Sequence, residues 1–227
     1  MSKNVIITGT SRGIGFEMAK IFANSGYNIL ALSRDSSKIT TINNNNISTL
    51  DFDITSDTDH LNLNNFLSST MDEVHVLINN AGLLVNKKFD KTSSDDFLNV
   101  FNTNVFGVAK LIQTCLPYMK KDSQVINISS VGGVQGSVKF AGLSAYSSSK
   151  GALITLTELL AEEYKDSGIH FNVLALGAVQ TEMLQEAFPG YEASTSANQM
   201  AEYIFDFATK GSKLINGKII QISSTTP

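Results

Sequence analysis

A tyrosine and a lysine four residues apart, Tyr146 and Lys150, are the best candidates for proton transfer in this sequence. In a helix this spacing puts both side chains on one face, so that the ammonium can sit beside the phenol. A phenol has a pKa of about 10 in water, and a neighbouring cation lowers that pKa toward the working range of an acid–base catalyst. A hydroxyl such as that of Ser130 could then hold a substrate oxygen.

The composition favours one domain over residues 1–227 and a small-molecule ligand. Of the 227 residues, 42% are hydrophobic, which is enough for a sizeable core without a linker. The net charge of -4 argues against a nucleic-acid groove or a basic membrane-binding face. The single cysteine, Cys115, excludes an internal disulfide, and neither CxxC nor HExxH is present, so we expect no metal site. The first residues do not resemble a signal peptide and no apolar run has membrane-spanning length, which predicts a cytoplasmic protein.

Short apolar runs alternate with helical patterns along the chain. The predicted strands are 5–7, 28–32, 47–52, 74–78, 124–128, 171–176 and 219–222. Two long helical segments, 97–119 and 144–165, are apolar on most faces and must therefore be covered on more than one side. This alternation predicts an α/β fold, a doubly wound parallel sheet of seven strands that is Rossmann-like.

Three glycines, Gly9, Gly13 and Gly15, lie between the first predicted strand and the helical pattern that follows it. Gly9 would permit a tight turn, Gly13 the close approach of a pyrophosphate, and Gly15 the packing of the helix on the strand. A strand, a glycine turn and a helix bring backbone N–H groups and a helix N-terminus to a phosphate. We therefore expect a dinucleotide site here.

The only arginines of the sequence, Arg12 and Arg34, fall in two loops that would flank the adenosine ribose of a dinucleotide. Ser33 and Arg34 follow the second predicted strand, at the place where an acidic side chain would bind the ribose hydroxyls and repel a 2′-phosphate. The alternative is that both arginines are solvated surface residues.

Polar residues also follow the third and fourth predicted strands. Asp53 could accept a hydrogen bond from an adenine amino group, while Thr55 or Ser56 could cap the next helix without a ligand role. The segment 79–82 is small and polar, and suits a close approach of the backbone to a ligand.

Taken together, these motifs resemble the short-chain dehydrogenase/reductase family over almost the whole chain. In the family's order they are Thr8-Gly9-x3-Gly13-x-Gly15, Asn79-Asn80-Ala81-Gly82, Asn104, Ser130 and Tyr146-x3-Lys150. The chain looks most similar to the single-domain 3-oxoacyl-carrier-protein reductases. The resemblance implies an oxidoreductase that transfers a hydride between NADP(H) and a small carbonyl compound or secondary alcohol.

The resemblance also implies a role for each matching residue. Tyr146 would be the general acid or base, with Lys150 lowering its pKa and holding the nicotinamide ribose. Ser130 would polarise the substrate oxygen, and Asn104 would hold a water that links Lys150 to solvent. The implied cofactor contacts are Gly9, Ser11, Arg12, Gly13, Ile14, Gly15, Ser33, Arg34, Asp53, Ile54, Asn80, Ala81, Gly82, Tyr146, Lys150, Gly177, Val179 and Thr181. The two arginines of this set resemble the family's determinants for NADP.

Some stretches depart from the family's pattern. The distance from Ser130 to Tyr146 is about three residues longer than in the commonest members, so Ser130 is assigned by motif alignment, with Ser129 as the alternative. Leu176-Gly177 stands where the family usually has Pro-Gly, which loosens the turn that follows. The segment 182–196 is shorter than the lid of many relatives, which predicts an open site for small carbonyl compounds.

The apolar faces of 97–119 and 144–164 exceed what one sheet can cover, so we expect a homodimer through these segments, as in relatives. A tetramer stays open, because residues 222–224 read Ile-Ser-Ser where many relatives have Asp-Gly-Gly at their tetramer contact. The alternative function is a dinucleotide-binding redox sensor or scaffold without turnover. A degenerate member would be expected to have lost one of the four implied catalytic residues, and all four are present.

Overall fold

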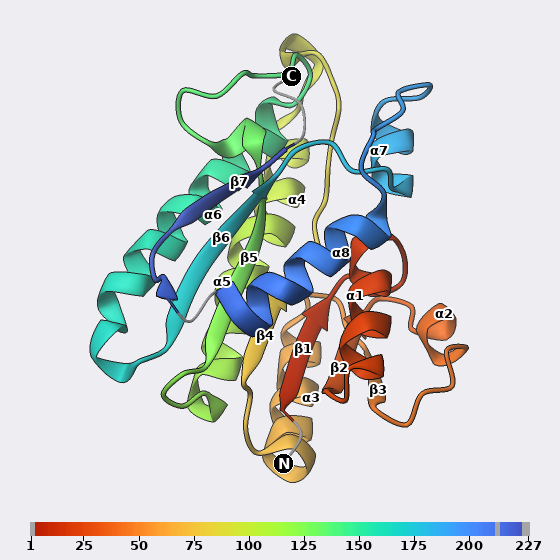
Figure 1. Ribbon diagram of the computed structural model, residues 1–227. Coiled ribbons are helices and arrows are strands. Elements are labelled where there is room, and N and C mark those ends of the chain that lie inside the picture. Colours follow the sequence, from red (N-terminus) through yellow and green to blue (C-terminus); the bar gives the residue numbers. More distant parts are fainter. Residues whose placement is uncertain (1–2, 212–213, 224–227) are drawn as a thin grey trace.

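The computed structural model of the chain describes residues 3–211 and 214–223. Its parallel strands form one seven-stranded sheet in the order β3-β2-β1-β4-β5-β6-β7 (Figure 1). The strands are β1 (Asn4–Thr8), β2 (Asn28–Ser33), β3 (Ile47–Asp51), β4 (Val76–Asn79), β5 (Gln124–Ser130), β6 (His170–Leu176) and β7 (Ile219–Ile222). The predicted α/β fold with a doubly wound, seven-stranded parallel sheet in one Rossmann-like domain is confirmed.

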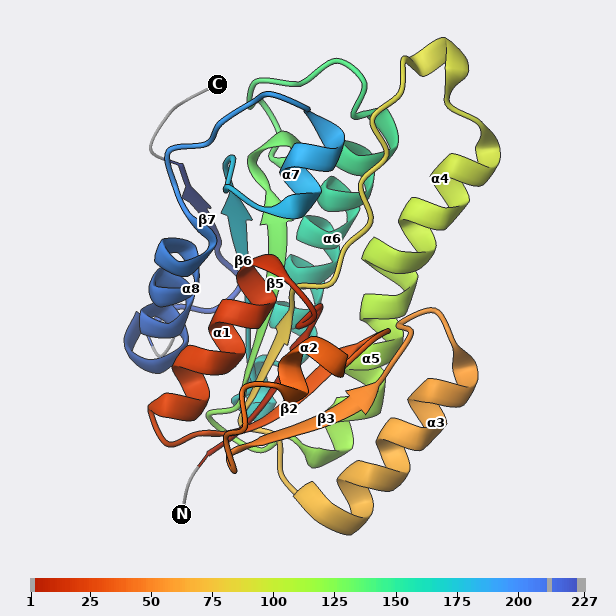
Figure 2. The same ribbon diagram turned by 90° about the vertical axis from the view of Figure 1, so that its right-hand side faces the viewer.

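Helices cover both faces of this sheet (Figure 2). They are α1 (Gly13–Asn24), α2 (Ser37–Thr40), α3 (Asp57–Phe66), α4 (Ser94–Phe101), α5 (Gly107–Cys115), α6 (Ser144–Glu163), α7 (Glu182–Ala187) and α8 (Ala197–Asp206). One core joins the sheet to α1 and α8 and contains Val5 and Ile7, whereas Ile6 belongs to the core under α3, α5 and α6. Both faces are therefore buried, which explains why the strands read as continuous apolar runs.

The prediction of one long helical segment at 97–119 is wrong in its detail. It begins earlier, at Ser94, because Ser93 and Asp96 form a reciprocal capping box. It is also interrupted between α4 and α5 by a π-helical turn, Asn102–Phe106, which contains Asn104. Such π turns are frequent at functional sites.

Smaller boundaries also differ from the prediction. β4 begins at Val76 rather than at residue 74, because the N–H of Val74 is bonded to the carbonyl of Tyr118, outside the sheet. The polar sequence of residues 38–47 predicts a loop, whereas residues 38–40 belong to the four-residue helix α2. Neither difference changes the order or direction of the strands.

The strand order reverses between β1 and β4, so the loops that follow these two strands diverge to opposite faces of the sheet. In open α/β sheets ligands bind in the crevice that this reversal leaves at the carboxyl ends of the strands. The glycine turn follows β1 and the segment 80–82 follows β4, so both lie at this crevice. None of the described helices is long and apolar enough to span a membrane.

Candidate active site

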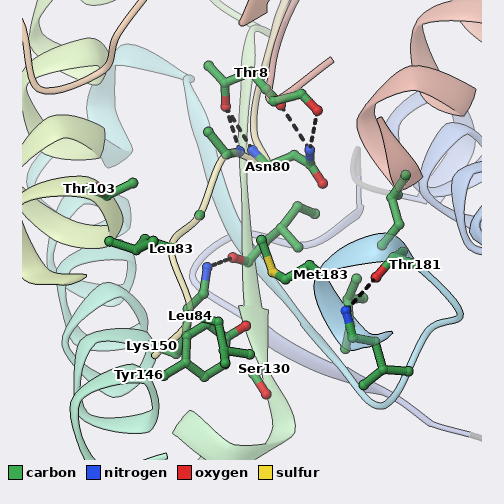
Figure 3. A pocket seen from close by; sticks show the side chains of 18 of the residues that line it. Thr8, Asn80, Leu83, Leu84, Thr103, Ser130, Tyr146, Lys150, Thr181 and Met183 are labelled. Atoms are coloured by element: carbon green, nitrogen blue, oxygen red, sulfur yellow. Dashed lines mark hydrogen bonds between the residues drawn. The ribbon is translucent and has the colours of Figure 1, made fainter. Parts of the chain in front are cut away.

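A cavity of about 830 Å³ lies at the carboxyl ends of the strands. This volume falls within the range of roughly 300–1,000 Å³ that is usual for small-molecule sites. Apart from Gly15 and Asn104, every residue of the predicted catalytic and cofactor sets lines it. In Figure 3, Tyr146, Lys150 and Ser130 lie close together, and Thr8 and Asn80 lie further along the cavity. Thr181, just before α7, and Met183, on α7, lie on the other side. The fold therefore brings together side chains that are scattered along the sequence.

The glycine turn forms a cradle without side chains beside the cavity. Gly9 and Gly13 have φ values of +73° and +59°, which L side chains rarely adopt. The carbonyl of Leu32 accepts hydrogen bonds from the N–H of Gly9 at 2.8 Å and from the hydroxyl of Thr10 at 3.3 Å, which tie the turn to the end of β2. The cradle and the N-terminus of α1 suit a dinucleotide's phosphates.

Gly15 does not line the cavity, and the structure gives it the predicted role of letting the helix pack on the strand. A Cβ at this position would lie 2.2 Å from the carbonyl oxygen of Gly9, where no side chain fits. Gly15 therefore allows α1 to approach the end of β1, and its contribution to a cofactor site is indirect.

Thr8 organises the site, although the sequence analysis gave it no role of its own. Its hydroxyl accepts hydrogen bonds from the N–H groups of Asn80 at 3.0 Å and Ala81 at 2.9 Å, and Asn80 Nδ2 donates to its carbonyl at 2.9 Å (Figure 3). These bonds hold the segment after β4 against the glycine turn. Two features of the sequence could have indicated this role: a threonine at the end of the first strand, and a small polar segment after the fourth strand.

Lys150 is buried and donates a hydrogen bond from Nζ to the carbonyl of Ile128 at 2.8 Å. Its ammonium lies over the ring of Tyr146, 5.7 Å from the ring centre. Burial lowers the pKa of Lys150 to about 8 and raises that of Tyr146 to about 12, while the Ser130 hydroxyl acts in the opposite direction on the phenol. The predicted lowering of the Tyr146 pKa is therefore not found, because burial disfavours the phenolate and is the largest cause of the shift. The phenol is protonated at neutral pH.

The buried charge of Lys150 leads to a prediction about stability. Below pH 8 folding must bury an ammonium, so Lys150→Met should raise the free energy of unfolding at pH 7 by about 2–3 kcal/mol. The gain should shrink between pH 8 and 10.5, because there wild-type Lys150 is neutral when folded and still protonated when unfolded. Urea unfolding of both proteins at pH 7 and pH 10 measures this. A Met variant that is less stable at pH 7 would contradict the assigned cost.

The two candidate serines have different surroundings. The hydroxyl of Ser129 donates to the carbonyl of Lys150 at 3.0 Å, so its proton is already engaged in the backbone of α6. Ser130 Oγ accepts from the N–H of Gly132 at 3.2 Å, and its hydroxyl lines the cavity and forms a hydrogen bond with Tyr146. The geometry therefore favours Ser130 over Ser129 as the hydroxyl that meets a substrate oxygen.

Asn104 is fully buried in the π turn and does not line the cavity. Its Oδ1 accepts from the N–H of Leu83 at 2.8 Å, and its Nδ2 donates to the Leu83 carbonyl at 2.9 Å and to Ser149 Oγ at 2.9 Å. Ser149 in turn donates to the carbonyl of Tyr146 at 2.7 Å. The side chain of Asn104 therefore links the segment after β4 to the first turn of α6, and Ser149 is a positioning residue that the sequence analysis missed.

The two arginines differ in their contacts. The guanidinium of Arg12 forms a two-pronged pair with Glu186 of α7, which joins Nη1 to Oε1 and Nη2 to Oε2, the second at 2.9 Å. Arg34 is exposed on the cavity and makes no ion pair with any residue that the structure describes. The hydroxyl of Ser33 donates to the carbonyl of Asp35 at 2.9 Å, which fixes the backbone beside Arg34.

The segment after β3 fits the expected place of an adenine. Asp53 Oδ1 accepts from the N–H and the hydroxyl of Thr55 at 2.8 and 2.7 Å, and the pKa of Asp53 is lowered by these bonds. Ser56, rather than Thr55, caps α3, since its hydroxyl accepts from the N–H of Asp59. Asp53 and Ile54 both line the cavity.

The remaining cofactor candidates lie after β6. The N–H of Gly177 donates to the carbonyl of Ile222 at 2.8 Å, and a Cβ there would lie 2.5 Å from Ser223 Oγ. Val179 is buried, and Thr181 caps α7 by accepting from the N–H of Leu184 at 3.3 Å. Beside them the cavity has an apolar wall formed by Leu83, Leu84, Val131, Phe140, Leu143, Met183, Leu184, Phe188 and Tyr191.

Comparison with known proteins supports the resemblance to the short-chain dehydrogenase/reductase family. Residues 3–192 match the family model described as short chain dehydrogenase. A probable short-chain type dehydrogenase/reductase of Helicobacter pylori is 32% identical over 84% of this chain and 70% of its own length. A 3-oxoacyl-[acyl-carrier-protein] reductase of Chlamydia trachomatis is 26% identical over 98% of this chain and 96% of its own length.

Solved structures agree with the fold. The protein ElxO, solved with NADP bound, has a TM-score of 0.84 and 28% identity, covering 98% of this chain and 97% of its own. A 4-hydroxyisoleucine dehydrogenase complexed with NADH has a TM-score of 0.86 and 23% identity, covering 98% and 97%. Structural relatives thus hold either dinucleotide. From its family-model match and its relatives, the chain belongs to the short-chain dehydrogenase family of oxidoreductases.

Proposed function

We propose that this protein is an NADP(H)-dependent reductase of small carbonyl compounds, or a dehydrogenase of the corresponding secondary alcohols. The observation that carries the proposal is the group formed by Tyr146, Ser130 and Lys150 at the cavity. The phenol is protonated at neutral pH, with a pKa of about 12, and therefore has a proton to give to a substrate oxygen. An NADP(H) bound in the cavity would supply the hydride.

The residues of the cavity fit such a cofactor. The glycine cradle and the N-terminus of α1 would hold the diphosphate, and Arg34 with Arg12 the 2′-phosphate. Asp53 and Ile54 would frame the adenine. A Cβ at Gly82 would lie 3.6 Å from Lys150 Nζ, so the glycine keeps space open beside the ammonium that would hold the nicotinamide ribose.

Each side chain near the reacting atoms has one task in this proposal. Ser130 donates a hydrogen bond to the substrate oxygen and orients it, and Tyr146 gives that oxygen a proton as the hydride arrives at the carbon. Lys150 favours the phenolate that remains, through its charge. Asn104 and Ser149 hold the backbone of the Tyr146 turn, and the water-holding role implied for Asn104 stays a prediction.

The apolar wall indicates the kind of substrate. Its residues carry no charge, and a cavity of this size accepts a small uncharged ketone or aldehyde more readily than a carboxylate. Mixing the protein with NADPH and a panel of small aldehydes and ketones, and following the cofactor's absorbance, tests this proposal. Cofactor binding without turnover of any carbonyl compound would favour the alternative, a redox sensor or scaffold.

We also propose a homodimer through the outer faces of α4, the π turn and α6. These neighbouring elements expose Leu98, Phe106 and Leu159 by 54%, 57% and 61%. Light scattering at micromolar concentration should give a dimer for the wild type and for Leu61→Lys on α3, and a monomer for Leu159→Lys. A monomeric wild type would remove this proposal. A tetramer stays open, since Ser224 of the expected contact lies outside the described residues, and the cytoplasmic location stays a prediction.

A further inference from the structure

Two carboxylates of α7 face the glycine turn. Glu186 holds both terminal nitrogens of the Arg12 guanidinium. Glu182 lies one helical turn earlier, and its Oε2 would be 3.7 Å from a Cβ at Gly13. Both glutamates act on Arg12, since each raises the pKa of its guanidinium. Negative charge therefore lies beside the turn that we propose to bind the cofactor's phosphates.

Arg12 and Arg34 both line the cavity and belong to loops that follow two adjacent strands. Arg12 lies in the turn after β1 and Arg34 just after β2, and the two loops are tied together at the carbonyl of Leu32. Of the two guanidinium groups, that of Arg34 is available to a ligand, whereas that of Arg12 is already occupied by a carboxylate.

A carboxylate and a phosphate bind a guanidinium in the same way, through two parallel N–H···O bonds. The terminal nitrogens of Arg12 cannot make this pair with both partners at once. We propose that Glu186 competes with the 2′-phosphate of NADP(H) for Arg12, and so reduces the preference of the protein for NADPH over NADH. The proposal rests on the NADP(H) function proposed above and adds a residue that determines cofactor specificity.

The competition also links the cofactor's phosphate to the wall of the substrate cavity. The C-terminal part of α7 is held by Arg12 through Glu186, and from the other side by Asn86, whose Nδ2 donates to the carbonyl of Ala187 at 2.8 Å. The same helix carries Met183 on the cavity (Figure 3). A 2′-phosphate that takes Arg12 from Glu186 removes one of these two anchors, whereas a ligand without that phosphate leaves both in place.

The test measures binding rather than turnover. Calorimetric titrations with adenosine 2′,5′-bisphosphate and with adenosine 5′-monophosphate isolate the contribution of the 2′-phosphate. Glu186→Gln should tighten binding of the bisphosphate by about two- to fivefold, the range expected for one exposed ion pair, and leave the monophosphate unchanged. Glu192→Gln removes the same charge from a nearby exposed position without a described ion pair, and should change neither ligand.

A double-mutant cycle separates competition from a general charge effect. If Glu186 acts through Arg12, the gain from Glu186→Gln should disappear in an Arg12→Gln background. An unchanged affinity in Glu186→Gln, an equal gain for both ligands, or a gain that persists without Arg12 would each overturn the proposal. If the wild type binds the bisphosphate no more tightly than the monophosphate, the NADP assignment fails and this inference fails with it. If the wild type distinguishes the two ligands but Glu186→Gln has no effect, only the inference fails.

Discussion

Tyr146→Phe should lower kcat for carbonyl reduction by at least about a hundredfold, the usual size of a general acid's contribution. The substitution removes the hydroxyl that would give its proton to the substrate oxygen, while the ring keeps its place under the ammonium of Lys150. Affinity for the cofactor should change little, because the ring still packs in the same position. Steady-state kinetics together with a cofactor titration measure both quantities.

Tyr164→Phe is the matched control for this change. Tyr164 follows the same helix at its far end, where its ring packs near Phe171, and it does not line the cavity. Its substitution should leave kcat within about twofold of the wild type, because Tyr164 is half-buried away from the cavity and its ring still packs near Phe171. More than about a tenth of the wild-type rate in Tyr146→Phe would show that the acid has been misassigned.

Arg34→Ala should raise the Michaelis constant for NADPH by about ten- to a hundredfold and leave that for NADH almost unchanged. The reason is the loss of a charge-assisted bond to the 2′-phosphate, worth roughly 1.5–3 kcal/mol. We expect a larger rise in the Michaelis constant for NADPH from a change at Arg34 than from one at Arg12, because Arg12 is already paired with Glu186. The Michaelis constants of both cofactors, measured at one ionic strength, give the result.

Lys38→Ala provides the control for Arg34, since it removes a positive charge from α2 that does not line the cavity. It should leave both Michaelis constants close to their wild-type values. Ser33→Asp should lower the preference for NADPH over NADH, since a carboxylate repels the 2′-phosphate of NADPH and accepts hydrogen bonds from the free ribose hydroxyls of NADH. A wild type that uses NADH as well as NADPH, or an equal loss for both cofactors in Arg34→Ala, would make the two arginines surface residues.

The central strands were predictable because they are buried on both faces and therefore read as continuous apolar runs, whereas the edge strands β3 and β7 are only partly buried. The interruption of the helix near Asn104 was not, since the apolar pattern of 97–119 continues through the π turn. Tertiary hydrogen bonds, rather than the local sequence, fix the π turn. Asn104 is bonded to Leu83 and Ser149, which lie 21 and 45 residues away in the sequence. Local spacing carries no record of such contacts.

That the site residues would gather at one cavity was predictable, because the glycine turn, residues 80–82 and Ser130 stand at the ends of strands that the fold brings to one edge. Their electrostatics were not. The effect of Lys150 on Tyr146 depends on where the ammonium points and on how deeply the phenol is buried, and both were visible only in the structure. The pairing of Arg12 with Glu186 spans 174 residues, so no spacing rule could have linked them.

Transfer of the label from NADPH that carries deuterium at both C4 hydrogens of the nicotinamide tests the central claim most directly. A carbonyl compound consumed in the panel assay should yield an alcohol that carries one deuterium on its carbinol carbon, as mass spectrometry of the product would show. Tyr146→Phe should form this labelled alcohol at no more than about a hundredth of the wild-type rate. If the alcohol forms without deuterium, or if no carbonyl compound is reduced while NADPH binds, hydride transfer from the cofactor to the carbonyl carbon is contradicted.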